Sequence, residues 1–215
     1  MIRVKICGVT TVEDARLAAD LGAAAIGLVF WPRSPRFVEV RQAKAIVAAL
    51  PPFVAAVGVF VNQVGEAASI ARDVGLNAVQ FHGDEPPDSY DSLPLRVIKA
   101  VAVRDASAEE RAAAVPAGAT VLLDAHDPIR RGGTGIPIDW SIAARVARRR
   151  PVILSGGLNP ANVAEAVDAV APYAVDVSSG VEMVFGRKDP EKMRALFGAL
   201  APFGIQHSAF GIDHD

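Results

Sequence analysis

The hydrophobic and polar positions of the chain repeat as a short apolar run followed by a longer amphipathic stretch. In the segment 3–7 apolar and polar residues alternate, and this period of two residues is typical of a strand. Most later runs are apolar without interruption, as expected of strands that are covered on both faces. Between the runs, apolar residues recur every three or four positions, as on the buried side of a helix. The pattern therefore predicts strands and helices in strict alternation.

Eight strands are predicted in this way, at residues 3–7, 25–30, 55–61, 78–81, 96–103, 120–124, 152–154 and 174–177. Helix starts are indicated by capping side chains or by proline in the first turn: Thr10 with Glu13, Pro86-Pro87, Ser107 with Glu110, Asp139, Asn159-Pro160 and Asp189-Pro190. Eight such units demand parallel strands and right-handed crossovers, and at this length they favour a compact (β/α)8 TIM barrel. A doubly wound open sheet is the alternative, but no glycine-rich dinucleotide turn follows the first strand.

No linker-like segment interrupts the alternation, so a single barrel domain is expected over residues 1–201. Residues 202–215 show no period and are expected to form a poorly ordered tail. The chain has 215 residues, a formal net charge of −2 and no long basic run, which argues against nucleic acid or an anionic membrane as a partner. The N-terminus lacks a signal-like apolar region and no apolar run reaches membrane-spanning length, so a soluble cytoplasmic protein is expected.

Two glycine- and serine-containing loops follow the last two predicted strands. In barrels of this class, phosphate usually binds in these loops, because glycine lets backbone N–H groups approach the phosphate oxygens. The loops are Ser155-Gly156-Gly157 and Ser178-Ser179-Gly180. We expect a phosphate site there, although tight turns alone would explain the same residues. The loop Gly132–Gly135 is either a third wall of the site or a lid.

Four polar side chains end predicted strands or follow them: Cys7, Arg36, His82 and Asp124. Cys7 is a general base or nucleophile if its thiolate is stabilised, for which the start of the first helix offers one means; otherwise it is a buried small hydrophobe. Asp124 is an acid, a base or a cap of its own loop. Arg36 offers a planar fork for a carboxylate or a phosphate, with Arg33 as a rival.

The remaining candidates have simpler interpretations. His82 taken alone is more often structural than catalytic. A metal site built from Cys7, His82, His126 and Asp124 has no ligand pair of diagnostic spacing, so we expect no metal. Lys5 and Lys99 lie on strands, where each either forms a Schiff base or pairs with a carboxylate. A single cysteine excludes an internal disulfide framework.

Nearly the whole chain carries motifs in one recognisable order. They are Lys5-Ile6-Cys7-Gly8 with Thr10; Gly27-Leu28-Val29-Phe30 running to Ser34-Pro35-Arg36; Gly58-Val59-Phe60 with Asn62; Gln80-Phe81-His82-Gly83; Leu122-Leu123-Asp124 with Gly132-Gly133-Thr134-Gly135; Ser155-Gly156-Gly157-Leu158 with Asn159 and Asn162-Val163; and Asp176-Val177-Ser178-Ser179-Gly180-Val181-Glu182. Together these motifs resemble the phosphoribosylanthranilate isomerases of tryptophan biosynthesis. The family more often has leucine in place of Phe81 and alanine in place of Ser155.

The resemblance implies an Amadori rearrangement of N-(5-phosphoribosyl)anthranilate to the 1-deoxyribulose 5-phosphate isomer. By the family's pattern, Asp124 would be the general acid and Cys7 the general base, and Arg36 would bind the anthranilate carboxylate. The phosphate would be held by Gly156, Gly157, Ser179 and Gly180, and His82 would line the site. No metal or redox cofactor is implied, because the substrate nitrogen itself serves as the electron sink.

Other functions remain open at this point. The similar Amadori step of histidine biosynthesis, or a bifunctional enzyme, is the nearest rival, but it looks for an aspartate where Cys7 stands. A Schiff-base lyase using Lys99 and a non-catalytic phosphate sensor are more distant alternatives. The expected partner is a small-molecule phosphosugar, and the outer helix faces allow a monomer or a homodimer.

Overall fold

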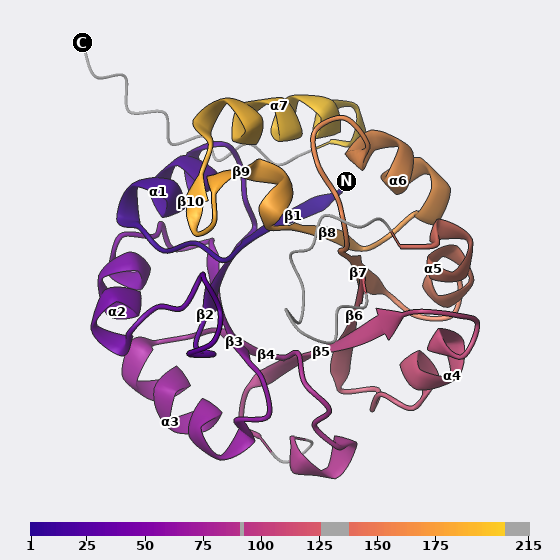
Figure 1. Ribbon diagram of the computed structural model, residues 1–215, viewed down its shortest axis with the longest axis horizontal. Coiled ribbons are helices and arrows are strands. Elements are labelled where there is room, and N and C mark those ends of the chain that lie inside the picture. The colour runs from indigo at the N-terminus through magenta and orange to yellow at the C-terminus, as the bar shows by residue number, and fades with distance from the viewer. Residues whose placement is uncertain (91–92, 126–137, 205–215) are drawn as a thin grey trace.

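The structure is a computed structural model that describes residues 1–90, 93–125 and 138–204. In this part of the chain, eight parallel strands close into a barrel in the order β1 to β8, and the helices lie around its outside (Figure 1). The strands are β1 (Arg3–Cys7), β2 (Ala25–Val29), β3 (Ala55–Phe60), β4 (Ala78–Phe81), β5 (Arg96–Val103), β6 (Ala119–Ala125), β7 (Val152–Leu154) and β8 (Ala174–Val177). The (β/α)8 barrel expected from the sequence is confirmed.

The helices of the described residues occupy the predicted positions between the strands, with one exception. They are α1 (Val12–Asp20), α2 (Val40–Ala48), α3 (Val64–Val74), α4 (Ala108–Ala113), α5 (Trp140–Ala147), α6 (Val163–Val170) and α7 (Pro190–Leu200). Between β4 and β5, where the sequence predicts a short helix, the structure has the 3₁₀ turn η1 (Pro87–Ser89). Further 3₁₀ turns are η2 (Ser179–Val181) after β8 and η3 (Ala201–Phe203) after α7.

The aspartates predicted to cap helices do so. The carboxylates of Asp139 and Asp189 each accept hydrogen bonds from two backbone N–H groups in the first turns of α5 and α7. These N–H groups have no partner inside the helix, so a side-chain acceptor stabilises the helix start by about 1 kcal/mol. The two caps fix where these helices begin.

The capping box predicted at Thr10 is wrong by one residue. Thr11 caps α1, and its hydroxyl oxygen accepts from the N–H of Asp14 at 3.2 Å. The Thr10 hydroxyl instead donates to the carbonyl oxygen of Gly186, far away in the sequence. A tertiary contact therefore takes the side chain that the local pattern assigned to the helix. Ser107 makes no capping hydrogen bond either, and α6 begins at Val163 rather than at Pro160.

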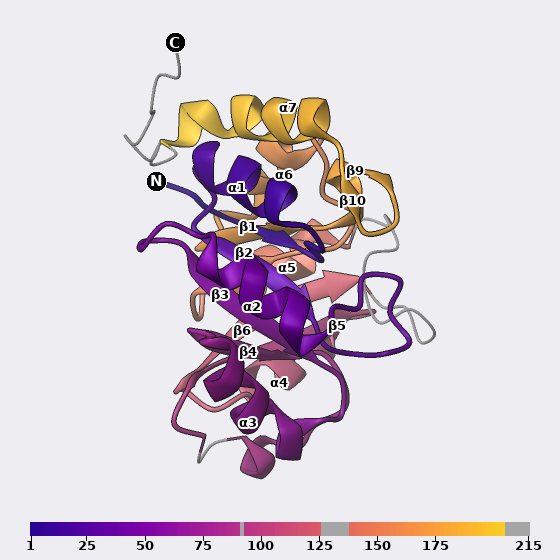
Figure 2. The same cartoon turned by 90° about the vertical axis from the view of Figure 1, so that its left-hand side faces the viewer.

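A short antiparallel hairpin, absent from the sequence prediction, follows β8. It consists of β9 (Glu182–Val184) and β10 (Arg187–Lys188). The hairpin lies beyond the C-terminal ends of the barrel strands, on the same side as the loop after β2 and away from the N-terminus (Figure 2). It thereby brings Glu182 and Lys188 to the end of the barrel where the predicted site residues lie.

The described residues of the barrel form three apolar clusters; the smallest surrounds Cys7, and the two larger ones form the main cores. One is formed between the strands and the surrounding helices. The other fills the barrel interior with inward-facing residues of the strands: Val57, Ala78, Ile98, Leu122, Ile153 and Ala174. Because side chains alternate along a strand, the next inward positions toward the C-terminal ends include Cys7, Gln80, Asp124 and Asp176. The middle of the barrel interior is thus filled by apolar side chains, and polar side chains lie nearer the C-terminal ends of the strands.

The start of the chain contacts the last described C-terminal residues on the other side of the barrel. The N–H of Ile2 donates to the carbonyl oxygen of Phe203 at 3.2 Å, which ties η3 to the start of β1. Of the expected tail 202–215, residues 205–215 lie outside the described residues. None of the helices in the described ranges is long and apolar enough to cross a membrane.

Candidate active site

The four polar residues singled out at strand ends meet at the C-terminal mouth of the barrel. Cys7 ends β1, Arg36 lies in the loop after β2, His82 follows β4, and Asp124 lies near the end of β6. All four line one small cavity. A larger cavity of about 570 Å³ adjoins it and also has His82 and Asp124 in its wall. The fold therefore brings together residues that are up to 117 positions apart in the sequence.

Cys7 is buried and points into the barrel, with 8% of the residue exposed. Burial raises the pKa of its thiol, because a thiolate loses solvation there, and the nearby Asp176 carboxylate acts in the same direction. The Lys5 ammonium group opposes both effects. Cys7 therefore forms a thiolate less readily than a free cysteine does, and the Lys5 ammonium group reduces this unfavourable effect of burial.

Lys5 and Asp176 form a buried ion pair inside the barrel. Their Cα atoms are register partners on β1 and β8, and Nζ lies 2.8 Å from Oδ1. Burial disfavours the ammonium form of Lys5, but the Asp176 carboxylate and the Cys7 sulfur together outweigh it and raise the pKa of Lys5. An amine held in this charged form is a poor nucleophile, which argues against a Schiff base at Lys5.

Lys99 is engaged in a similar way. Its Nζ lies 2.6 Å from Oε2 of Glu85 and donates to the carbonyl oxygen of Gly83 at 2.7 Å. Glu85 also accepts from the N–H groups of Asn62 and Gly83, so it braces the loops after β3 and β4. Lys99 is therefore a structural ion-pair partner in this geometry, and the lyase alternative finds no free amine there.

The side chains of His82 and Asp124 are in direct contact. Nε2 of His82 lies 3.1 Å from Oδ2 of Asp124, and Nδ1 lies 3.3 Å from Nε2 of Gln80. Asp124 is almost fully buried, with 3% of the residue exposed. His82 thus links an inward-facing amide of β4 to the carboxyl group that the sequence marked as an acid or base.

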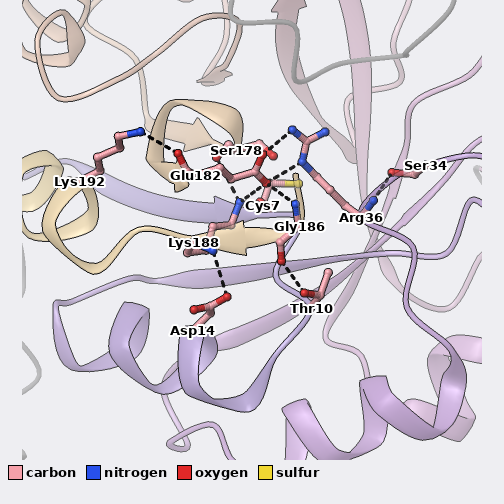
Figure 3. Close-up of polar contacts among 10 residues, drawn as sticks. All are labelled: Cys7, Thr10, Asp14, Ser34, Arg36, Ser178, Glu182, Gly186, Lys188 and Lys192. Atoms are coloured by element: carbon pink, nitrogen blue, oxygen red, sulfur yellow. Dashed lines mark hydrogen bonds and ion pairs between the residues drawn. The ribbon is translucent and has the colours of Figure 1, made fainter. Parts of the chain in front are cut away.

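Arg36 is held by Glu182, a residue that the sequence analysis did not single out as its partner. Figure 3 shows the guanidinium and the carboxylate side by side, with Nε–Oε1 and Nη2–Oε2 distances of 2.7 Å. Burial opposes ionisation of Glu182, but the hydrogen bonds and charges of Arg36 and Lys188 outweigh it and lower its pKa. The Arg36 backbone N–H donates to the hydroxyl oxygen of Ser34 at 3.1 Å. The plane of the guanidinium is therefore fixed.

Lys188, on the hairpin, ties three elements together at the barrel mouth. Its Nζ donates to the carbonyl oxygen of Cys7 at 2.6 Å, to that of Ser178 at 3.1 Å and to Oε1 of Glu182 at 3.0 Å (Figure 3). Burial lowers the pKa of Lys188, although the Glu182 carboxylate opposes this effect. An ammonium group has three N–H donors, and these contacts use all of them.

The loops after β7 and β8 have the features of an anion site. Gly156 and Gly157 adopt positive φ angles of 87° and 68°, and their N–H groups donate to no other described residue. The side-chain amides of Asn159 and Asn162 hold the carbonyl oxygen of Gly157. Ser179 opens η2, whose first N–H groups have no partner within the turn.

A glycine is required where these two loops touch. A Cβ on Gly180 would lie 1.9 Å from the carbonyl oxygen of Leu158, so the loops can pack only without a side chain there. Ser155 and Ser178, rather than the four residues predicted to bind phosphate, line the cavity itself. The predicted loops are thus beside the cavity, with their serines on its wall.

Some predicted features lie outside the described residues. These are the loop Gly132–Gly135 and His126, a member of the rejected metal site. Among the residues that the structure describes, no group of three or more His, Cys, Asp or Glu side chains is placed to share a metal ion.

Sequence reasoning missed the partners of the predicted residues. Lys5 and Asp176 did carry a signal, because each is a charged residue between two apolar neighbours on its strand, and their strands close the barrel. Glu182 and Lys188 carried none, since their hairpin has no hydrophobic period that points to it.

Comparison with known proteins gives one consistent family. The family model described as N-(5′-phosphoribosyl)anthranilate (PRA) isomerase matches residues 4–199. A protein of Geobacter sulfurreducens with that enzyme name is 50% identical over 198 residues, which are 90% of this chain and 96% of the relative. The crystal structure of phosphoribosyl anthranilate isomerase from Thermotoga maritima is 43% identical, with a TM-score of 0.88 over 94% of this chain and 100% of that one. Another solved isomerase of this name, in complex with reduced 1-(o-carboxyphenylamino)-1-deoxyribulose 5-phosphate, is 42% identical, with a TM-score of 0.85 and the same coverage.

Proposed function

The chain belongs to the N-(5′-phosphoribosyl)anthranilate isomerase family, and from this premise we propose how its residues divide the work of that reaction. The activity is the Amadori rearrangement of N-(5′-phosphoribosyl)anthranilate to 1-(2-carboxyphenylamino)-1-deoxyribulose 5-phosphate, a step of tryptophan biosynthesis. The observation that carries the proposal is that Cys7 and Asp124 line one cavity from β1 and β6. A proton donor and a proton acceptor can therefore reach one sugar.

Asp124 is the general acid of the first step. Its carboxyl group gives a proton to the ring oxygen as the bond between that oxygen and C1′ breaks. The nitrogen lone pair forms the C1′=N bond, so the furanose opens to a protonated Schiff base and Asp124 is left as a carboxylate. The contact of 3.1 Å between His82 and Asp124 supports this role, because it orients the carboxyl group toward the cavity.

Cys7 is the general base of the second step. Its thiolate removes the proton from C2′, and the electrons of the C–H bond form C1′=C2′ while the C1′=N electrons return to nitrogen. The enaminol that results becomes the ketone when C1′ gains a proton and the C2′ hydroxyl loses one. The substrate nitrogen donates its lone pair in the first step and takes the electrons back in the second, so the carbon skeleton needs no redox partner.

The two ends of the substrate are held by different groups. Arg36 binds the anthranilate carboxylate with the N–H groups that face away from Glu182, since that ion pair uses only Nε and Nη2. The N–H groups of Gly156, Gly157, Ser179 and Gly180 bind the phosphate. Binding energy from these non-reacting groups orients the sugar between acid and base.

Turnover of freshly generated phosphoribosylanthranilate by the purified protein tests the proposal, with the aminoimidazole substrate of the histidine-pathway isomerase run in parallel. We expect activity on the first substrate, and we expect Cys7→Ser and Asp124→Asn each to lower kcat by about 10²- to 10⁴-fold with little change in KM. Near-normal turnover in either variant would remove that residue from the mechanism. Activity on both substrates would mean a bifunctional site.

We further propose that the protein works in the cytoplasm on a small-molecule phosphosugar, as a monomer or a homodimer. One solved relative is described as a monomeric form of the dimeric isomerase of Thermotoga maritima, which supports both assembly states within the family. Light scattering of the purified chain over a range of concentrations distinguishes them.

A further inference from the structure

Lys5 carries a buried charge that the proposed reaction does not use. We propose that Lys5 is a positioning residue whose ammonium group serves as the counter-ion of the Cys7 thiolate, and that Gly27 leaves the space in which the two groups meet. The inference rests on the proposed role of Cys7 as a base. It adds a residue that acts on the base rather than on the substrate.

The geometry around Gly27 places the two groups together. Gly27 on β2 is the register partner of Cys7 on β1. A Cβ built on Gly27 would lie 2.8 Å from Sγ of Cys7 and 3.0 Å from Nζ of Lys5. The sulfur and the ammonium nitrogen therefore lie next to the same point inside the barrel, and any side chain at residue 27 would crowd both groups.

Lys5 is held in the form and direction that this role requires. Its Nζ donates one hydrogen bond to Asp176, and within the described residues no second acceptor is in contact with it other than the nearby sulfur. The ammonium group has two further N–H donors for that sulfur. Because Lys5 and Cys7 both lie in a water-poor interior, their attraction is stronger than it would be at the surface.

Other charged groups near Cys7 are committed elsewhere. Lys188 donates its three N–H groups to two carbonyl oxygens and to Glu182, so none is left for the sulfur. The start of α1, which the sequence suggested as the stabilising element, carries the acidic residues Glu13 and Asp14 in its first turn. In the described part of the chain, the titratable or charged groups that face Cys7 or share its cavity are Lys5 on β1, Asp176 on β8, Asp124 on β6, His82 after β4, Arg36 after β2, and Lys188 with Glu182 on the hairpin.

Lys5 and Asp176 shift the pKa of Cys7 in opposite directions. Burial raises the pKa of Cys7, the Lys5 ammonium is the largest influence that lowers it, and Asp176 raises it again. Removing the ammonium should therefore make the thiolate harder to form, and removing only the Asp176 charge should make it easier. These opposite signs separate an electrostatic role from a general loss of packing.

The thiolate can be measured without turnover, because Cys7 is the only cysteine of the chain. The rate of alkylation by iodoacetamide, followed from about pH 7 to about pH 11, reports the midpoint of thiolate formation. Lys5→Met alone would leave the Asp176 carboxylate buried without a partner and risks unfolding. The double variant Lys5→Met/Asp176→Asn removes both charges and is the primary test.

We expect the midpoint to rise by about 1 to 2 pH units in the double variant and to fall in Asp176→Asn. Gly27→Ala keeps both charges but separates them, so its midpoint should move toward that of the double variant. The exposed pair Lys44 and Asp73 offers the matched control, because Lys44→Met/Asp73→Asn makes the same chemical change far from the sulfur and should leave the midpoint unchanged.

An unchanged midpoint in the double variant, or a rise in Asp176→Asn, would overturn the role of Lys5. The acid limb of the pH profile of kcat should shift with the alkylation midpoint if Cys7 is the base. If Cys7→Ser retained normal turnover, the proposed function of Cys7 would fail, yet the alkylation midpoints would still decide whether Lys5 stabilises the thiolate. The two failures are therefore distinguishable.

Discussion

Arg36 and Glu182 form a two-point ion pair at the mouth of the barrel, with both N–O distances at 2.7 Å. Their side chains are 8% and 5% exposed, and they come from the loop after β2 and from the hairpin after β8. A guanidinium fixed in this way loses little freedom when a carboxylate binds to its open edge. In the role proposed for Arg36, Glu182 would support substrate binding without touching the substrate.

Glu182→Gln should therefore weaken binding more than it slows the chemistry. The amide keeps the size of the side chain but offers one acceptor oxygen where the carboxylate offers two, so Arg36 is held less firmly. We expect KM for phosphoribosylanthranilate to rise about tenfold, equivalent to about 1.4 kcal/mol of binding, with kcat within a factor of two to three. Steady-state kinetics measure both.

Arg36→Lys is the companion variant, because it keeps the positive charge and loses the fork that binds a carboxylate at two points. It should raise KM at least as much as Glu182→Gln does. A fall in kcat with unchanged KM in both variants would instead place the pair close to the reacting atoms.

The Glu182 carboxylate should make the stability of the protein depend on pH. Burial disfavours the Glu182 carboxylate, but Arg36 and Lys188 outweigh it, so its folded pKa lies below the ordinary value of 4.5. Such a group contributes stability above the unfolded pKa, and this contribution is lost as the pH falls through the folded value. Urea unfolding of the wild type and Glu182→Gln should show a constant free-energy difference above about pH 5 that shrinks toward zero at lower pH. A constant difference throughout would contradict the lowered pKa.

Lys188→Met should be strongly destabilising. The change leaves the carbonyl oxygens of Cys7 and Ser178 without their donor and removes one cation from Glu182. Breaking a buried ion pair on one side costs about 3 to 5 kcal/mol. Lys192→Met is the control, since this more exposed lysine donates only one hydrogen bond, to the Glu182 carbonyl oxygen, and should cost less than about 1 kcal/mol. If both variants lost the same free energy of unfolding in urea, the buried contacts of Lys188 would not be what stabilises this end of the barrel.

Gly180→Ala should separate the loops after β7 and β8. The new methyl group would overlap the carbonyl oxygen of Leu158, so we expect KM for the phosphorylated substrate to rise at least about tenfold and stability to fall by about 1 to 3 kcal/mol. Gly198→Ala, in α7 with no atom within 4 Å of the added Cβ, should instead stabilise the protein by about 0.5 to 1 kcal/mol. Unchanged KM in Gly180→Ala would argue against phosphate binding there.

The barrel could be predicted because its information is local and repeated. Most strands are apolar runs, and Asp139 and Asp189 cap their helices through backbone N–H groups two or three positions away. Thr10 shows the limit of this reasoning, because its hydroxyl donates a hydrogen bond to the carbonyl oxygen of Gly186, in a hairpin that is distant in the sequence. A local pattern cannot show which of two nearby acceptors or donors a side chain will use once the chain has folded.

The candidate site divides in the same way. Cys7, Asp124 and Arg36 could be named in advance because parallel strands end at one face of a barrel, where any polar residue becomes a site candidate. Their partners could not be named, because Glu182 and Lys188 lie in a short hairpin without hydrophobic periodicity, whose position depends on contacts with β1 and the loop after β2.

By itself, the sequence determined the order of strands and helices, the end of the barrel that holds the site and the chemical types of the groups there. The tertiary structure alone decided the distances: Lys5 beside the Cys7 sulfur over Gly27, and Arg36 locked to Glu182. The physical reason is that a hydrophobic pattern depends only on residues that are neighbours in the sequence. The ionisation of a buried group depends instead on charges a few ångströms away, and these charges can be more than a hundred residues apart in the sequence.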